Sequence, residues 1–187
     1  MQALRHEYRR WLDLVDSRNF VFIDESGVNL AMTRLRGRSP IGERVVDSTP
    51  RNYGQNVSVL GALSFDGVLA VMTIAGSVDT AVFRTYITQV LVPQLWKGAI
   101  VLCDNLQVHK AAGIREAIEA VGAKLVFLPP YSPDLSPIEL CWSKLKHLLR
   151  SAKARTYADL NQAIATALDH INPDDAAGWF AHCGLFN

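Results

Sequence analysis

The sequence is poor in cysteine, has no long apolar run and carries almost no excess charge of either sign. Only three of its 187 residues are cysteines, and none has CxxC spacing. This argues against a disulfide framework or a structural zinc site and fits a reducing cytoplasm. The apolar runs are short and interrupted, so we expect no membrane span, and the charged N-terminus does not resemble a signal peptide. With 49% hydrophobic residues and a net charge of +1, the composition is that of one compact globular domain.

The order of apolar runs and turn signals predicts an α/β fold. An Asp66-Gly67 turn joins two β-type runs and predicts an antiparallel hairpin, and the rest of the chain alternates strand and helix. We therefore expect a single domain (1–187) with a mixed β-sheet, an antiparallel hairpin plus parallel strands, flanked by helices. It would have a lead-in helix segment (1–18) and a C-terminal helical tail (156–187). The expected strands are 20–23, 56–63, 68–74, 99–103 and 124–128; the expected helices are 2–15, 80–95, 110–121, 137–151 and 157–170, with a long loop or ribbon over 32–51 and a short mixed segment after 172.

Three acids stand where such a fold places functional groups. Asp24 and Asp104 each follow an apolar strand, at the carboxyl end where open α/β sheets build their sites. Glu139 lies near a helix start, just after a proline-rich turn. Three carboxylates from separate elements can hold two Mg²⁺ ions, which prefer oxygen ligands. From position alone the alternative stays open: such an Asp can form a turn or cap a helix, and a Glu in a first helical turn favourably meets the helix dipole.

The segments around these acids resemble a known family. In chain order they are residues 21–27 (VFIDESG), 103–110 (CDNLQVHK) and 128–139 (LPPYSPDLSPIE). Together they resemble the DDE-type catalytic domain of bacterial insertion-sequence transposases in the mariner-like superfamily. The 34 residues between Asp104 and Glu139 match the spacing characteristic of that superfamily. The similarity runs from about Trp11 to the C-terminus.

The resemblance implies a ribonuclease-H-like fold and two Mg²⁺ or Mn²⁺ ions as cofactor. It implies cleavage at transposon ends by water, then attack of the freed 3′-hydroxyl on target DNA, commonly at TA. The partners would be double-stranded DNA and a second copy of the chain, and the protein would be nucleoid-associated in the cytoplasm. Asp24, Asp104 and Glu139 take the positions of the catalytic metal ligands. Asn105 and His109 are candidates to orient a carboxylate or touch a phosphate; the alternative for His109 is a helix-capping or solvent-facing residue.

The chain departs from the family pattern in two places. Ser136 stands where the family usually has Asn, and because serine can cap a helix we expect this turn to survive. The helix-turn-helix region that recognises transposon ends in the family is absent, so a separately encoded DNA-binding partner is expected, unless the chain is a remnant. Two alternatives to a transposase domain follow. One is a truncated, non-catalytic DNA-binding or regulatory product, and the other is a stand-alone ribonuclease-H-like nuclease that cuts without joining.

Two basic segments are candidates to hold the DNA backbone. One is the arginine-rich stretch Arg34–Arg51, and the other begins on the helix that carries Glu139. Because the second segment starts beside Glu139, we predict DNA contact rather than the alternative of a solvated helix face. The predicted contacts are Arg34, Arg36, Arg38, Lys144, Lys146 and Arg150. The aromatic residues Phe83, Tyr86 and Trp142 are expected to be core or lid residues.

Overall fold

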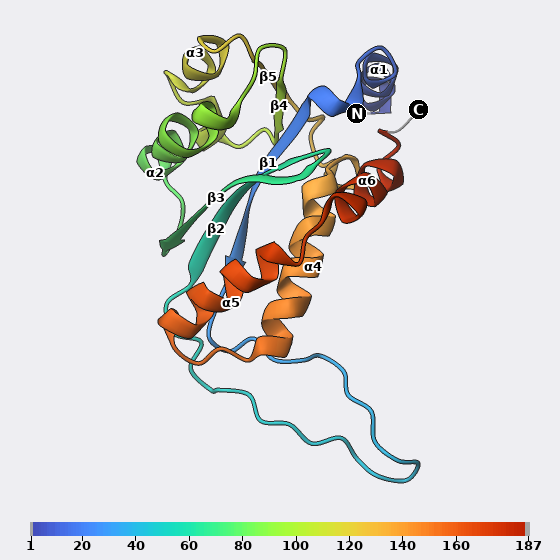
Figure 1. Cartoon of the computed structure of the whole chain (residues 1–187), viewed down its shortest axis with the longest axis vertical. Coiled ribbons are helices and arrows are strands. Elements are labelled where there is room, and N and C mark those ends of the chain that lie inside the picture. The colour runs from blue at the N-terminus through green and yellow to red at the C-terminus, as the bar shows by residue number, and fades with distance from the viewer. Residues whose placement is uncertain (1, 186–187) are drawn as a thin grey trace.

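The computed structural model describes residues 2–185 and has one five-stranded sheet between two layers of helices (Figure 1). Met1, Phe186 and Asn187, which belong to the predicted lead-in segment and tail, lie outside the described residues. The strands are β1 (Phe20–Val28), β2 (Val57–Ser64), β3 (Gly67–Ala75), β4 (Ile100–Cys103) and β5 (Lys124–Phe127). The helices are α1 (Gln2–Leu12), α2 (Thr80–Thr85), α3 (Ile114–Glu119), α4 (Pro137–Ala152), α5 (Tyr157–Asp169) and α6 (Pro173–His182).

The sheet is mixed, as predicted. Its strand order is β3-β2-β1-β4-β5, in which β1, β2 and β3 pair antiparallel while β1, β4 and β5 pair parallel. The predicted hairpin is β2–β3, and its turn includes Gly67, whose positive φ of 122° favours glycine. The carboxyl ends of the parallel strands therefore lie at one edge, where the chain passes into loops that can carry functional groups.

Strand β1 runs further than predicted, and this changes the setting of Asp24. Only Phe20–Phe22 pair with β4, whereas pairing with β2 continues to Val28. Asp24 therefore lies inside a strand, opposite Gly61 of β2, and the prediction that it follows the strand is wrong. It does lie just beyond the point where β4 leaves β1. Strand β2 thus pairs with the backbone of Asp24 on one side of β1. On the other side, the described pairing with β4 ends at Phe22.

The two faces of the sheet have separate hydrophobic cores. Alternate residues of β1 point to opposite faces, so Phe20 and Phe22 pack with α1, α4, α5 and α6, while Val21 and Ile23 pack with α2 and α3. The predicted helix at 80–95 begins as α2 and then widens to a π-helical segment at Tyr86–Leu91 before ending in a 3₁₀ turn. All three aromatic residues expected in the core, Phe83, Tyr86 and Trp142, are buried.

Two helix predictions need correction. The expected helix at 110–121 is a 3₁₀ turn at Gln107–Lys110 followed by the short α3, because Gly113 between them adopts a positive φ of 86°. The short mixed segment expected after residue 172 contains helix α6. Its start carries a capping box in which the side chains of Asn172 and Asp175 each accept a hydrogen bond from the other's backbone N–H.

Helix α6 belongs to the core because of Phe180, which is fully buried. Its ring makes edge-on contacts with Phe22 of β1 at 5.6 Å and with Phe65 at 5.7 Å between centroids. The C-terminal part of the chain therefore closes one face of the sheet.

Residues 32–56, called the ribbon here, leave the body as a long loop between β1 and β2, as predicted (Figure 1). Its two ends are held by the segment after α4: the Arg155 guanidinium donates to the carbonyl oxygens of Leu30 (2.9 Å) and Met32 (3.2 Å), and the Tyr157 hydroxyl bonds to the backbone N–H and C=O of Gln55. Within residues 2–185, no helix is both long and apolar enough to cross a membrane.

Candidate functional site

The three predicted acids line one cavity. In the β1–β4 register Phe22 lies beside Leu102, so Asp24 and Asp104, each two residues further on, are at the same level of the sheet edge. Glu139 reaches the same place from the first turn of α4. Together they line a cavity of about 390 Å³, whose other wall is the proline-rich turn 129–136. Residues from three distant parts of the sequence are thus brought to one opening.

The donor set of this cavity suits a hard divalent cation. Carboxylate oxygens are the protein ligands that Mg²⁺ prefers, and Mg²⁺ commonly completes its shell with water and substrate phosphates. Among the described residues, no group of three His, Cys, Asp or Glu side chains is drawn together closely enough to hold an ion. The three carboxylates therefore line the cavity without forming a closed cage.

Asp24 occupies an environment that opposes its charge. Burial raises its pKa to about 6; the hydrogen bond from the Glu25 backbone N–H opposes this, and the negative charge of Glu139 adds to it. The indole Nε1 of Trp142 donates to Oδ2 of Asp24 at 3.0 Å. A cation at this place would relieve an unfavourable accumulation of carboxylates.

Asp104 is held in its charged form. Partial burial raises its pKa, but His109 and the backbone N–H of Leu106 outweigh burial and bring the pKa below its ordinary value. Nδ1 of His109 lies 2.6 Å from Oδ1 of Asp104. Neither ring nitrogen has a hydrogen-bond partner of good geometry. The contact is nevertheless direct, and His109 is one of the causes that lower the pKa of Asp104.

The solvent-facing alternative for His109 is wrong, because the residue is only 1% exposed. It lies in the 3₁₀ turn after β4, and its ring is 4.3 Å from that of Phe83 in α2. Oε2 of Glu25, on the same side of β1, is also buried without a hydrogen-bond partner. Burial raises the pKa of Glu25, while the nearby His109 lowers it.

Asn105 lines the cavity but its amide is engaged elsewhere. Its Nδ2 donates to the carbonyl oxygen of Leu128 at 2.5 Å, which links the loop after β4 to the end of β5. The residue therefore fixes the backbone on both sides of the opening.

The proline-rich turn is held from outside by α1. The Arg5 guanidinium donates to the Ser132 hydroxyl at 2.7 Å and forms a two-pronged ion pair with Asp134. Tyr131, at the rim, has a positive φ of 55°. The turn before α4 is present, as expected, with a 3₁₀ segment at Pro133–Leu135. Ser136 precedes α4 but its side chain makes no capping hydrogen bond; its carbonyl accepts from the Glu139 N–H at 3.2 Å.

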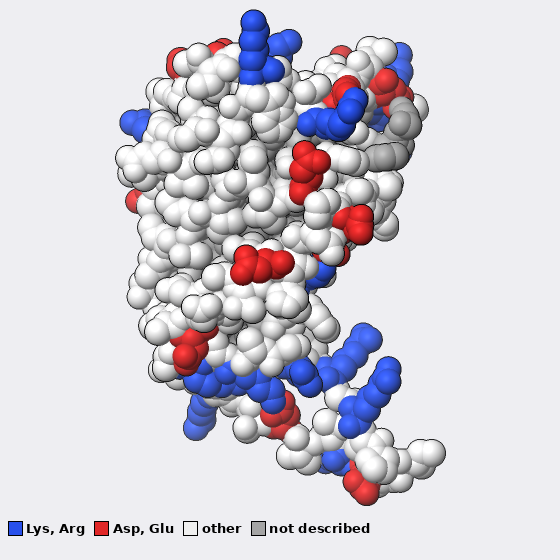
Figure 2. All heavy atoms as spheres, viewed as in Figure 1, with Lys and Arg blue, Asp and Glu red and all other residues white. Residues whose placement is uncertain are grey.

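The two basic segments meet at the opposite end of α4 from Glu139. Arg34, Arg36 and Arg150, with His147, line a second cavity of about 540 Å³. Figure 2 shows Lys and Arg gathered over this end of the molecule, where the ribbon leaves the body. Neither Arg38 nor Lys146 lines this cavity. Lys144 forms an ion pair with Asp175 of α6, so its charge is already balanced within the chain.

From the sequence, Glu25 and Arg5 received no predicted role and Trp142 only that of a core or lid residue, although all three shape the site. Trp142 follows Glu139 by three residues on a helix, a spacing that places both side chains on one face, so its proximity could have been foreseen. Nothing in the sequence links Arg5 to a turn more than 120 residues away, since only the packing of α1 brings them together.

The comparisons with known proteins agree with this architecture. The family model described as DDE superfamily endonuclease matches residues 19–161. The chain belongs to this family. It is 27% identical to the Tcb1 transposable element transposase of Caenorhabditis briggsae over 157 residues, which cover 79% of this chain and 56% of that protein. The chain thus spans about half the length of the curated relatives it matches.

The fold is that of the Mos1 mariner transposase. A Mos1 paired-end complex with the left transposon end superposes with a TM-score of 0.76 at 17% identity, covering 96% of this chain and 56% of the other. A Mos1 paired-end complex with Mg superposes with a TM-score of 0.67 at 19% identity, covering 98% and 56%. The expected ribonuclease-H-like architecture is confirmed.

Proposed function

We propose that this chain is the catalytic domain of a transposase, which cuts DNA and joins the freed end to a target. The observation that carries the proposal is the gathering of Asp24, Asp104 and Glu139 around one cavity in a member of the DDE superfamily endonucleases. The similarity to the Tcb1 transposase supports it further.

In this proposal Asp24, Asp104 and Glu139 hold two Mg²⁺ or Mn²⁺ ions. When bound, such ions activate the attacking oxygen and stabilise the leaving one in phosphoryl transfer. The fold of the chain holds each of the three carboxylates in place. Strand pairing with Gly61 fixes Asp24, the Leu106 N–H and His109 keep Asp104 charged, and the first turn of α4 presents Glu139. The proline-rich turn forms one side of the opening.

Double-stranded DNA is the proposed substrate, held along α4 between the acidic cavity and the basic one. Arg34, Arg36 and Arg150 converge there and are the strongest candidates for phosphate contact. Arg38 and Lys146 remain candidates outside the lining of this cavity. Lys144 is a weaker candidate because it is paired with Asp175.

We also propose that the active form is a homodimer. The support is the ribbon, where Leu35, Ile41 and Val46 expose most of their apolar surface. Exposed apolar side chains clustered on one element are typical of protein interaction sites. Light scattering of the purified protein tests this: a monomer at all accessible concentrations, with and without DNA, contradicts it.

The test of the catalytic proposal is metal-dependent cleavage of supercoiled plasmid DNA. We expect Mg²⁺ or Mn²⁺ to support nicking by the protein, and Asp104→Ala to abolish it. The matched control is Glu119→Ala, which removes an exposed acid of α3 whose only described ion pair is with Arg115. Nicking that survives in Asp104→Ala refutes the assignment.

Two further results would separate the alternatives. Joining is measured separately, with a DNA end that is already cut and carries a free 3′-hydroxyl. A protein that nicks plasmid DNA but does not join this end to a target is a nuclease. Absence of any nicking or metal binding by the intact protein indicates a non-catalytic module.

A further inference from the structure

Trp142 connects two of the elements that carry the proposed metal ligands. It lies on α4 one helical turn after Glu139, is 3% exposed, and donates its indole N–H to Oδ2 of Asp24 in β1. A hydrogen bond to one carboxylate oxygen fixes the rotation of that carboxylate and leaves the other oxygen for a cation. The same contact sets the distance between α4 and β1.

A glycine in the sheet makes room for the Trp142 ring. Gly61 of β2 is the strand partner of Asp24, and Trp142 packs directly over it. A Cβ at position 61 would lie 2.5 Å from Cη2 of the Trp142 ring, closer than real Cβ contacts come, and 3.1 Å from Cζ2, which is tighter than most of them. Only glycine at this place allows the ring to come near enough to the sheet for its N–H to reach Asp24.

Trp142 of α4 thus contacts both Gly61 of β2 and Asp24 of β1, and the contact with Asp24 is a hydrogen bond. The indole ring has one hydrogen-bond donor and no acceptor, and when it is buried this N–H usually donates to a nearby acceptor. The oxygen that it finds belongs to the most deeply buried of the three acids of the cavity. The acceptor that satisfies this indole is thus one of the three acids of the cavity.

We propose that Trp142, seated on Gly61, is the residue that positions the Asp24 carboxylate for metal binding and couples it to Glu139 on α4. The inference rests on the proposed function, since it assigns a role within the same site. Trp142 acts through Asp24 and does not itself touch the metal or the DNA.

The experiment measures Mn²⁺ binding by isothermal titration calorimetry, without DNA and without any activity assay. Removal of an outer hydrogen bond of this kind typically weakens metal affinity 10- to 100-fold. We therefore expect Trp142→Phe to weaken Mn²⁺ binding by roughly 10-fold or more. Gly61→Ala should weaken it similarly, because the indole is retained but displaced.

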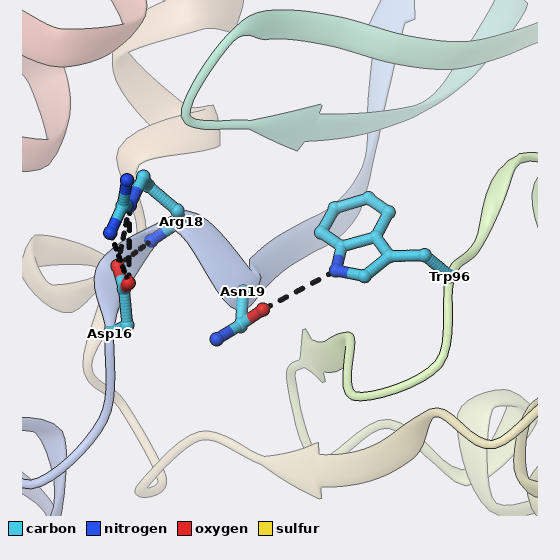
Figure 3. Close-up of polar contacts among 4 residues, drawn as sticks. All are labelled: Asp16, Arg18, Asn19 and Trp96. Carbon is cyan, nitrogen blue, oxygen red and sulfur yellow. Dashed lines mark hydrogen bonds and ion pairs between the residues drawn. The ribbon is translucent and has the colours of Figure 1, made fainter.

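Trp96→Phe is the matched control. Its indole Nε1 also donates to a side-chain oxygen, Oδ1 of Asn19, at 3.3 Å (Figure 3), and neither residue lines the cavity of the three acids. We expect its Mn²⁺ affinity to equal that of the unmodified protein. A loss of affinity in this variant as large as that in Trp142→Phe would overturn the inference, because it would show a general effect of losing an indole that donates a hydrogen bond.

A further variant covers the case in which Trp142→Phe does not fold. Incorporation of β-(3-benzothienyl)alanine at position 142 keeps the shape of the ring and replaces the N–H by sulfur. Folded protein that carries either change and binds Mn²⁺ within twofold of the original overturns the positioning role and leaves the proposed function intact. Failure of the unmodified protein to bind Mn²⁺, or equal binding by Asp104→Ala, instead overturns the proposed function itself.

Discussion

Replacing Asp24 by asparagine should stabilise the metal-free protein, although it removes a proposed catalytic ligand. The carboxylate is buried beside Glu139, and its pKa rises from 3.8 to about 6 on folding. An asparagine keeps an oxygen that can accept the Trp142 N–H and carries no charge. The change therefore removes the unfavourable charge while it preserves the hydrogen bond that holds the side chain.

The size of the effect follows from the difference between the two pKa values. Because folding raises this pKa, the folded protein binds the proton more tightly than the unfolded chain does, so stability falls as the pH rises from 3.8 to about 6 and stays low above that. The difference corresponds to about 3 kcal/mol at neutral pH. An amide must also be desolvated at this place, so we expect Asp24→Asn to raise the free energy of unfolding by about 1 to 2 kcal/mol.

The assay is urea denaturation in EDTA, followed by tryptophan fluorescence, at neutral pH and at about pH 4.5, where most of the effect should vanish. Asp13→Asn, at an exposed acid after α1, is the control and should change little. Saturating Mn²⁺ should then stabilise the unmodified protein by mass action but not Asp24→Asn, which reverses their order. A variant that is less stable than the unmodified protein in EDTA at neutral pH refutes the reasoning.

Three other predictions concern different parts of the molecule. Arg34→Ala and Arg150→Ala should each weaken DNA binding and reduce the salt dependence of log K by about one, measured by fluorescence anisotropy, whereas Lys144→Ala should change binding less; an equal loss in all three contradicts the ranking. Arg5→Ala should release the proline-rich turn, seen as faster limited proteolysis there and slower nicking, and unchanged cleavage of the turn would show that α1 does not hold it. Phe180→Ala should lower the free energy of unfolding by about 3 to 5 kcal/mol in chemical denaturation, and a loss below about 1 kcal/mol would mean that α6 is not part of the core.

The sheet and the three acids were predictable because their signals are local. Apolar runs bounded by turn residues mark the strands, and each acid stands in a distinctive segment. The position of Asp24 within β1 was not predictable in the same way. It depends on β2 continuing to pair after β4 has left, which is a property of two strands together.

Helix α6 was missed although its cap is written in the sequence. The pair Asn172-Pro173 is a typical signal for the end of a helix, but here it also begins the next one, with Asp175 completing the capping box. The sequence did not allow the basic residues to be ranked as DNA contacts, because it does not reveal which of them form ion pairs within the protein. Lys144 finds Asp175 only when α4 and α6 pack together.

The way the ribbon is attached has a practical consequence for engineering. The hydrogen bonds of Arg155 and Tyr157 hold its two ends, and Lys153 binds Asp47 at 2.6 Å, while Ile41 at the far end is fully exposed. Because loop-closure entropy changes slowly with length, residues can be removed from or inserted into this far end at little cost to stability. A fluorophore at position 41 should therefore cost little folding stability, and because Ile41 belongs to the proposed dimer surface it would report on association.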